Sequence, residues 1–498
     1  MKGWQLGFEA LRATKRTSDR MADNLVGTIE SRKLQTVDRK VRRRGYLIPG
    51  DDDPPPGSDI LDYRGLVASD DLARQTSRDT AAFTVGRAIN LDTGAPGQAV
   101  RLDVERIFQH AAVVAPPGSG KTAGIIVPWT VRLLRAGASV VVLDVTGTLG
   151  EQIREFSQAS RQPNAPKVRT LRWTLHPRHP AHSWNPLVGV EHSDTLAIEG
   201  LRTALAGDEP ADPRHRDFHD RDLRLLGSVI RLSLAAEPEA SLTTVARAIS
   251  SRDELERLNV GSRRHDLAIA WEDLSDSWTL RNKLEPFLDP QVRDVTTRSD
   301  FRLNDVLTEH TLLVVGAELE LKSTSQAAAA LLINRLMSHL QSRFDSHDGR
   351  PVVIVMDEAP ILAQRIDLSS ILATARATRT GVVLACQNVT QFGDDRASSS
   401  VFDSCDMMAV LPGASDHTIG RFQARLGDRE VGRYSLNEAV GSTRRVVNVD
   451  RSSERMATIG VREILNPPFG RYPAFVHSRS LAAQPFVVEL DRSIGEPE

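Results

Sequence analysis

Residues 113–124 read VVAPPGSGKTAG, and this stretch decides the fold. Gly118 and Gly120 permit backbone conformations and close approaches that a Cβ atom would block. Successive backbone N–H groups in such a loop point at phosphate oxygens, and Lys121 adds a positive charge beside them. The Thr122 hydroxyl is suited to ligate Mg²⁺. The stretch follows an apolar strand pattern and precedes a helical pattern, which is the context that a phosphate-binding loop requires.

One position departs from the common G-x-x-x-x-G-K-[ST] pattern, because Ala115 stands where the first glycine is expected. That glycine mainly eases the turn, so we expect the loop to form without it. The sequence therefore predicts a site for ATP with Mg²⁺. The residues expected to surround the phosphates are Pro117, Gly118, Ser119, Gly120, Lys121, Thr122 and Ala123.

A second strand pattern supplies acidic partners for this loop. PVVIVMDEAP at 351–360 places Asp357 and Glu358 at the carboxyl end of an apolar strand. Ligands of open α/β sheets bind at that edge. We expect Asp357 and Thr122 to hold Mg²⁺, and Glu358 to orient and deprotonate the attacking water.

A third strand pattern, TGVVLACQNVTQF at 380–392, adds polar candidates. Gln387 falls where a side chain could sense the γ-phosphate, and Gln391 is next along the chain. Just upstream, Arg376 and Arg379 could reach the nucleotide of a neighbouring subunit in a ring. Taken alone, such a glutamine is usually a loop residue and such arginines are usually solvated. The expected catalytic residues are Glu358, Lys121, Gln387 and Arg376.

The strand patterns form two blocks that a helical stretch separates. Lys121 and Asp357 lie more than 230 residues apart, far more than a compact P-loop domain needs. Residues 191–300 show long helical periods and almost no β-branched runs. We predict an α/β fold with an inserted all-α domain. The predicted limits are 1–50 for a basic, helical extension, 51–80 for a linker, 81–190 and 301–480 for the sheet domain, 191–300 for the insertion, and 481–498 for a carboxy-terminal tail.

Charge is distributed unevenly along the chain. The 498 residues carry a net charge of −2, so a nucleic-acid site would have to be local. Residues 1–49 hold twelve Lys or Arg against five Asp or Glu. This segment is either a solvated helical extension or a docking arm for DNA, acidic lipid or a partner.

The sequence contains no signal peptide and no apolar run long enough to cross a bilayer. We expect a cytoplasmic protein, with any association with the inner face of the membrane made through a partner. Cys386 and Cys405 lie in apolar segments and are expected to be buried thiols rather than a disulfide.

Histidines do not form a convincing metal pattern. The two clusters have no second ligand pair at zinc-like spacing, so we predict no zinc site. The clusters are His215 with His219, and His176 with His179 and His182.

Further segments extend the pattern beyond the P-loop. They are AHSWNPLVGV at 181–190, LRNKLEPFLDPQVRDVTTRSDFRLNDVL at 280–307, and SCDMMAVLPGASDHTIGRFQARLG at 404–427. Together with the P-loop and MDEAP, they resemble the VirD4/TraG/TraD coupling-protein ATPases of conjugation and type IV secretion, within the FtsK/HerA motor group. The resemblance covers about residues 81–480.

This resemblance implies a RecA-like motor domain, six copies of which surround a central channel. It also implies ATP hydrolysis that drives DNA, or a DNA–protein conjugate, through the ring, and a secretion-channel or membrane partner. Lys121, Thr122, Asp357 and Glu358 carry over directly, and Gln387 matches the strand-end glutamine of the family. Arg376 lies where an intersubunit arginine is plausible.

Two departures from the family pattern are visible. Members typically carry amino-terminal membrane helices, whereas this chain has a basic segment there. The second strand ends in DVTG at 144–147, where the family often has a lysine. Other functions stay open: a receptor for protein secretion substrates, a HerA-like motor in DNA processing or defence, and a nucleotide-gated scaffold.

Overall fold

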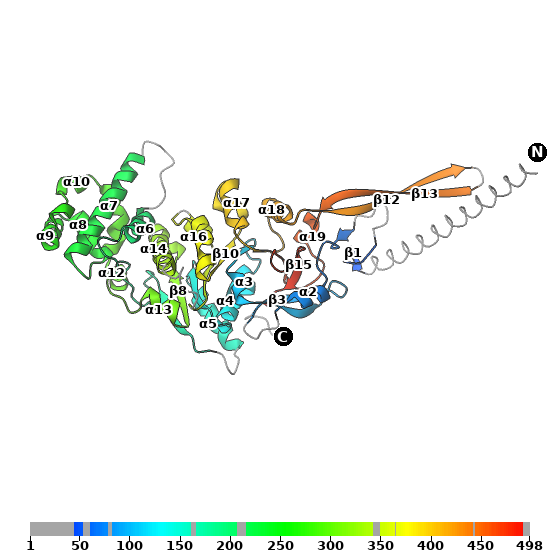
Figure 1. Cartoon of the computed structure of the whole chain (residues 1–498), viewed down its shortest axis with the longest axis horizontal. Helices are drawn as coiled ribbons and strands as arrows, with labels where there is room; N and C mark the ends of the chain where they lie inside the picture. Colours follow the sequence, from blue (N-terminus) through cyan, green and yellow to red (C-terminus); the bar gives the residue numbers. More distant parts are fainter. Residues whose placement is uncertain are drawn as a thin grey trace, which may run out of the picture.

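The molecule is elongated, with a helical body at one end, a large sheet in the middle and a hairpin at the other end (Figure 1). The computed structural model describes residues 44–52, 60–77, 82–160, 166–206, 216–341, 349–363, 365–441 and 444–491. The predicted extension 1–50 lies mostly outside these residues. No helix within the described ranges is long and apolar enough to cross a membrane.

An eleven-stranded sheet forms the centre, in the order β4-β3-β15-β14-β11-β5-β10-β9-β6-β8-β7. The seven strands from β11 to β7 are parallel, and the four from β4 to β14 add antiparallel pairs at one edge. The strands are β3 (Phe83–Ile89), β4 (Pro96–Leu102), β5 (Ala111–Val114), β6 (Ser139–Asp144), β7 (Arg169–Trp173), β8 (Thr311–Gly316), β9 (Val352–Met356), β10 (Thr380–Cys386), β11 (Met407–Val410), β14 (Pro473–Ser478) and β15 (Phe486–Glu489).

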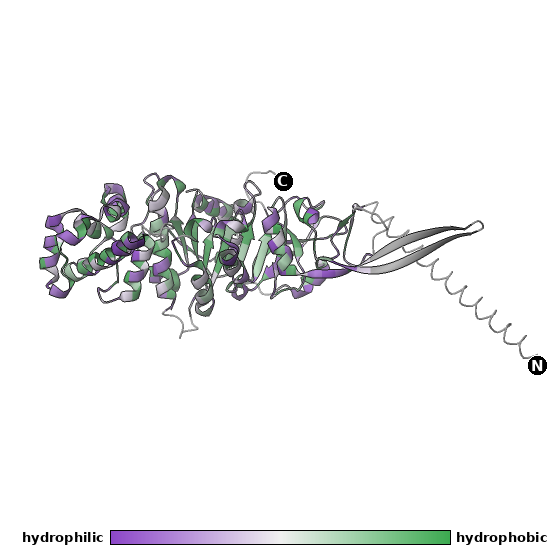
Figure 2. Ribbon diagram, turned by 90° about the horizontal axis from the view of Figure 1, so that it is seen from above, coloured by the Kyte–Doolittle hydropathy of each residue, from purple (hydrophilic) through white to green (hydrophobic). Residues whose placement is uncertain are grey.

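Helices cover both faces of the parallel part, which is why its central strands are mostly apolar. Every residue of β5, β6, β9 and β10 is buried. Successive side chains point to opposite faces of a sheet, so β9 contributes Ile354 to one core and Val355 to the other. One face is covered by α4 (Val127–Arg135) and α5 (Leu149–Ala159), and the other by α14 (Lys322–Gln341) and α16 (Leu368–Ala375). Figure 2 shows apolar strands at the centre and many hydrophilic residues on the helices at the insertion end.

The described residues between β7 and β8 contain helices and no strand, which confirms the predicted inserted all-α domain. Its apolar residues belong to the same core cluster as those on one face of the sheet, from Ile198 in the insertion to Leu331 on α14. The two parts are therefore continuous in packing. The main helices are α6 (Thr195–Ala206), α7 (Arg216–Ala236), α8 (Leu242–Ser250), α9 (Arg252–Ser262), α10 (Trp271–Ser275), α11 (Trp278–Leu284), α12 (Pro290–Thr296) and α13 (Leu303–Thr308).

Two predicted boundaries are wrong. The segment 481–498 is not simply a tail, because β15 pairs with β14 and with β3 inside the sheet. The strand is only four residues long and ends in Glu489, so its role depends on strands far away in sequence. The segment 51–80 is not only a linker, because it holds β2 (Leu61–Asp62), which pairs with β1 (Tyr46–Leu47), and α2 (Ser69–Gln75).

A long antiparallel hairpin was also not anticipated within the sheet domain. It consists of β12 (Asp428–Gly441) and β13 (Arg444–Ala457) and projects beyond the sheet (Figure 1). At its base Arg429 forms an ion pair of 2.7 Å with Asp62. The amino-terminal strand pair is thus tied to a segment that follows it by more than 360 residues.

Gly381 on β10 tests the packing of the central strand. A Cβ atom at this position would lie 2.7 Å from the Ile107 carbonyl oxygen at the end of α3 (Val104–Ile107). We expect Gly381→Ala to destabilise the fold by about 1–3 kcal/mol, as overpacking does. Thermal unfolding followed by circular dichroism measures this. The control is Gly420→Ala on α18 (Asp416–Leu426), where a Cβ atom meets nothing within 4 Å and a helical alanine gains stability. An unchanged Tm for Gly381→Ala would contradict the close packing.

Candidate nucleotide-binding site

The loop after β5 has the backbone of a phosphate cradle. Gly118 and Gly120 have φ angles of +74° and +87°, a region that side chains disfavour. Ser119 N donates to the Pro116 carbonyl at 3.2 Å, and Gly124 N donates to the Gly120 carbonyl at 2.7 Å. These bonds turn the chain directly into η1 (Thr122–Ile126), a π-helical turn that leads into α4. The first turn of a helix presents unpaired N–H groups that suit an anion.

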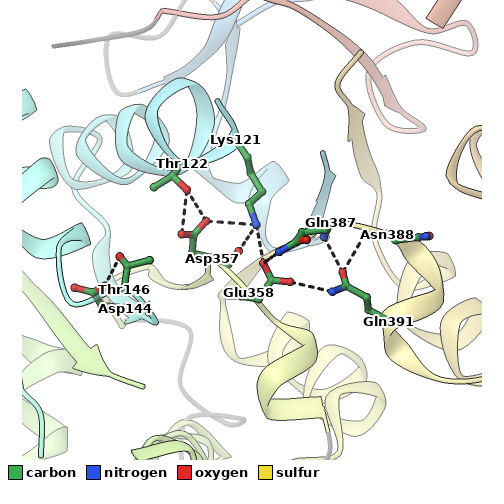
Figure 3. Close-up of polar contacts among 9 residues, drawn as sticks. All are labelled: Lys121, Thr122, Asp144, Thr146, Asp357, Glu358, Gln387, Asn388 and Gln391. Atoms are coloured by element: carbon green, nitrogen blue, oxygen red, sulfur yellow. Dashed lines mark hydrogen bonds and ion pairs between the residues drawn. The ribbon is translucent and has the colours of Figure 1, made fainter. Parts of the chain in front are cut away.

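Lys121 points across the sheet edge to the end of β9 (Figure 3). Its Nζ donates to the Asp357 carbonyl at 2.6 Å and to Glu358 Oε2 at 3.1 Å, and it lies 3.7 Å from Asp357 Oδ1. The structure thereby brings together a cation and two carboxylates that the sequence separates by more than 230 residues. The Lys121 ammonium already lies within the site, so the oxygens of a bound phosphate could replace its acidic partners.

Thr122 and Asp357 form the arrangement expected of a magnesium site. Thr122 Oγ1 lies 3.1 Å from both carboxylate oxygens of Asp357. Burial raises the pKa of the Asp357 carboxyl, while the charge of Lys121 and the Thr122 hydrogen bond act against this rise. A hydroxyl and a buried carboxylate are hard oxygen ligands, which Mg²⁺ prefers together with water and phosphate. These residues fit a Mg²⁺–nucleotide.

Glu358 is held by two glutamines from the end of β10. Gln387 Nε2 donates to Glu358 Oε2, and Gln391 Nε2 donates to Glu358 Oε1, both at 3.4 Å. The Gln391 side-chain oxygen accepts the backbone N–H groups of Gln387 and Asn388 at 2.8 and 2.9 Å. Gln391 therefore fixes the β10 turn and also touches the carboxylate. The sequence pattern favoured Gln387 over Gln391. The signal that could have singled out Gln391 is its place three residues after Asn388, where the two side chains form a capping box.

The end of β6 forms another side of the site. Asp144 is fully buried, and its carboxylate accepts the Gly147 N–H at 2.7 Å and the Thr146 hydroxyl at 3.3 Å. On β8, the neighbouring strand on one side, Gly316 is aligned with Asp144. On β9, the neighbouring strand on the other side, Met356 is aligned with Leu143, the residue before Asp144. In this chain the DVTG turn thus has a hydroxyl rather than an ammonium group beside the site, and Asp144 shapes the turn.

The structure does not bring Arg376 or Arg379 to this site. Both precede β10, whereas the cluster of Lys121 and Glu358 lies beyond its carboxyl end. Arg379 is engaged within its own chain, 3.7 Å from Glu105 and over the Phe108 ring. Arg376 is exposed, and no ion pair joins it to the part of the chain that the structure describes.

The structure also shows the surroundings of the histidines and cysteines considered in the sequence analysis. His176 is 2.9 Å from Glu320, and its ring lies 5.0 Å from that of His179. No group of three metal-ligating side chains occurs in the described ranges, from which His215 is missing. Both cysteine thiols are free and buried, and burial raises the pKa of each to about 12.

Comparisons with known proteins show a matching family and related sequences. The family model for type IV secretory system conjugative DNA transfer matches residues 67–267 and 275–458. VirD4 of Agrobacterium fabrum is 23% identical over 341 residues, which are 64% of this chain and 49% of VirD4. VirD4 of Rhizobium rhizogenes is 21% identical over the same length, with the same shares covered. The chain spans about half the length of these curated relatives.

Solved structures show the same fold. The conjugative coupling protein TrwBdeltaN70 in its unbound form has a TM-score of 0.62 at 16% identity, covering 86% of this chain and 92% of TrwB. TrwB in complex with ADP and Mg²⁺ has a TM-score of 0.60 at 15% identity, covering 86% and 93%. At such identities the likeness concerns the fold alone, and it confirms the predicted α/β architecture.

Two substitutions separate nucleotide binding from chemistry at this site. Lys121→Ala removes the cation, so we expect weaker binding of Mg²⁺–ATP and no hydrolysis. Glu358→Gln keeps the shape but removes the base, so we expect ATP to bind and turnover to fall by about 10²–10⁴-fold. Equilibrium binding of a labelled ATP analogue and phosphate release measure the two effects. Glu155→Gln, an exposed change on α5, is the matched control. Normal turnover in Glu358→Gln would refute the assignment of the base.

Proposed function

Because the chain belongs to the type IV secretory system conjugative DNA transfer family, we propose that it is an ATP-driven motor that moves DNA or a DNA–protein conjugate. The observation that carries this proposal is the cluster of Lys121, Thr122, Asp357 and Glu358 at one sheet edge. This cluster has a cation for phosphate, oxygen ligands for Mg²⁺ and a carboxylate for water. A scaffold that only binds nucleotide would not need the last of these.

Each side chain has a separate task in the proposed hydrolysis. Lys121 leaves Glu358 and contacts the β- and γ-phosphates, and the loop N–H groups hold the remaining oxygens. Thr122 and Asp357 hold Mg²⁺, which supplies positive charge to the transferred phosphoryl group. Glu358, once free of Lys121, accepts a proton from the attacking water.

Gln387 and Gln391 are proposed to orient Glu358. Each donates to a different oxygen of its carboxylate, so together they fix the plane of the carboxylate. A side chain at the end of β10 that touches the base is also well placed to respond when the γ-phosphate leaves. The strand end is therefore the proposed link between hydrolysis and movement.

A ring of six copies is proposed from the family resemblance. The exposed Arg376 is free to meet a neighbouring subunit, whereas Arg379 is bound to Glu105 and Phe108 of its own chain. We therefore favour Arg376 as the residue that reaches a neighbour's phosphates. Residues 1–49, with their excess of basic side chains, are proposed to recruit DNA or a membrane partner on the cytoplasmic side.

The main test is ATP hydrolysis by the full chain with and without single- and double-stranded DNA. A DNA motor is expected to hydrolyse ATP several-fold faster with DNA. Lys121→Ala is expected to abolish both rates, and Glu358→Gln to lower both by about 10²–10⁴-fold. Phosphate release at two salt concentrations measures this, because phosphate contacts weaken with salt. Hydrolysis that DNA leaves unchanged at both salt concentrations would contradict a DNA cargo and favour a protein substrate.

Mixed rings test the role of Arg376. Arg376→Ala and Glu358→Gln subunits are each expected to be inactive alone. When the two are mixed, some interfaces combine an intact Glu358 with an intact Arg376 from the neighbour, so partial hydrolysis should return. Arg379→Ala replaces Arg376→Ala in the control mixture. A lack of recovery in the first mixture, with assembly verified by light scattering, would refute action between subunits.

A further inference from the structure

A small pocket of about 280 Å³ lies where the helical insertion meets the sheet domain. It is far from the nucleotide cluster along the chain, and its walls come from three segments: the turn at 184–189, the start of α13 and the middle of α14. Figure 1 shows α13 and α14 at this junction. The proposed hydrolysis uses none of these residues.

Arg335 on α14 is the unusual residue of the pocket. It is 6% exposed, yet its only recorded hydrogen bond within the described residues is a long one, 3.4 Å from Nη2 to the Val188 carbonyl. Its Nε has no partner, and no ion pair with a described residue is present. A guanidinium has five N–H donors, and burying a charge with so few hydrogen-bond partners is costly. Packing alone would be satisfied by an apolar side chain.

The charged groups around Arg335 leave the pocket positive. Asp194 is the acid whose charge favours the Arg335 cation, but its carboxylate accepts the Ala197 N–H at the start of α6. Burial, and to a lesser degree the nearby Arg335 charge, lower the pKa of His339, so its ring is neutral at physiological pH. Arg302 adds an exposed guanidinium at the rim. The pocket therefore suits an anion.

Apolar side chains form a second part of the wall, and hydrogen bonds hold the turn beside them. Trp184 and Leu303 are each 3% exposed and face the pocket space. The turn that carries Val188 is fixed by Asn185, whose side-chain oxygen accepts the Leu187 N–H at 3.0 Å and whose amide donates to the Ala240 carbonyl at 2.9 Å. A ligand would find one buried cation and a rigid apolar surface beside it.

We propose that this pocket binds a carboxylate attached to an apolar group, with the Arg335 guanidinium as its partner. The planar guanidinium offers two parallel N–H bonds to a carboxylate, and a charge-assisted pair of this kind is stronger than neutral hydrogen bonds. A single buried cation between apolar walls matches one negative charge. Phosphate, with its higher charge and stronger hydration, fits these walls poorly.

Such a group can come from a small organic acid or from the terminal residue of a polypeptide. In either case the ligand joins the 184–189 turn to α14, and α14 packs against α6 of the insertion. Occupancy is therefore expected to hold the insertion against the sheet domain. The proposal does not depend on ATP hydrolysis or on DNA.

The test is isothermal titration calorimetry of the full chain with defined probes. They are acetyl-Ala-Ala-Leu with a free carboxylate, the same peptide with a carboxy-terminal amide, N-acetyl-leucine and inorganic phosphate. We expect the free carboxylate peptide to bind and the amide to bind at least about tenfold more weakly, since a charged hydrogen-bonded pair is lost. Equal binding of N-acetyl-leucine identifies a small acid as sufficient, and tighter binding of the peptide identifies a polypeptide end. Either result supports the carboxylate pocket.

Variants distinguish a ligand-binding arginine from a structural one. Arg335→Met fills the space without charge, so it should abolish carboxylate binding while leaving Tm equal or higher. Arg281→Met is the contrast, because Arg281 donates to the Ile249 and Leu274 carbonyls at 3.0 and 3.2 Å and lies over the Trp271 ring. Its loss should lower Tm.

Arg335→Lys keeps a charge without the planar fork and should bind the peptide more weakly. This variant keeps the test valid if Arg335→Met does not fold.

Three results would overturn the proposal. The first is that no carboxylate probe binds at millimolar concentration. The second is that Arg335→Met or Arg335→Lys binds the free peptide as tightly as the unmodified chain does. The third is that phosphate binds more tightly than the carboxylates, which would contradict the chemical class of the ligand.

Discussion

The alignment of three parallel strands is the constraint on which the site depends. β10 lies between β5 and β9, with Cys386 aligned with Val114 and Leu384 aligned with Met356. The alignment continues past the strand ends, because Ala115 N donates to the Cys386 carbonyl at 3.1 Å and Ala359 N donates to the Ala385 carbonyl at 2.9 Å. A shift of one residue would turn every side chain of a strand to the opposite face. The phosphate loop, the acidic pair and the glutamine pair therefore reach one edge together.

The same alignment concentrates charge where little water can reach it. Asp357 is 7% exposed, and burial raises the pKa of its carboxyl despite the nearby Lys121. The Lys121 ammonium lies within ion-pairing distance of both acids. Asp357 and Thr122 would hold Mg²⁺ in the proposed site, and bound phosphates would offer Lys121 further partners.

The helical insertion is joined to the sheet domain through a shared apolar core. One core cluster extends from Ile198 to Leu331 and on to Ile354 of β9. A charge buried at this junction, as at Arg335, is costly in a region that otherwise follows apolar packing. The ligand proposed for the pocket beside this junction would add a contact between the 184–189 turn and α14, which itself packs against the insertion.

The sequence by itself determined which residues are candidates for the main site. Two patterns can be recognised locally: a glycine-rich loop between a strand and a helix, and acids at the end of an apolar strand. Each depends on the backbone conformation, the residue types and the order of strands near it in the chain. From these, Lys121, Thr122, Asp357 and Glu358 were expected together, and the structure places them within hydrogen-bonding or ion-pairing distance. The long helical periods likewise predicted the insertion, because a 3.6-residue period reports burial of one helix face.

Only the tertiary structure decided the features that depend on segments distant in sequence. β15 became a strand because β14 and β3 pair with it, although its four-residue run gave no clear signal. Gln391 joined the site through a turn contact, and Arg376 was separated from the site by the full length of β10. The buried Arg335, whose Nε has no partner among the described residues, has no sequence signature, because an arginine in a helical pattern looks the same whether it is solvated or buried. Burial and pairing are properties of the neighbours that the fold supplies, and a local pattern does not contain those neighbours.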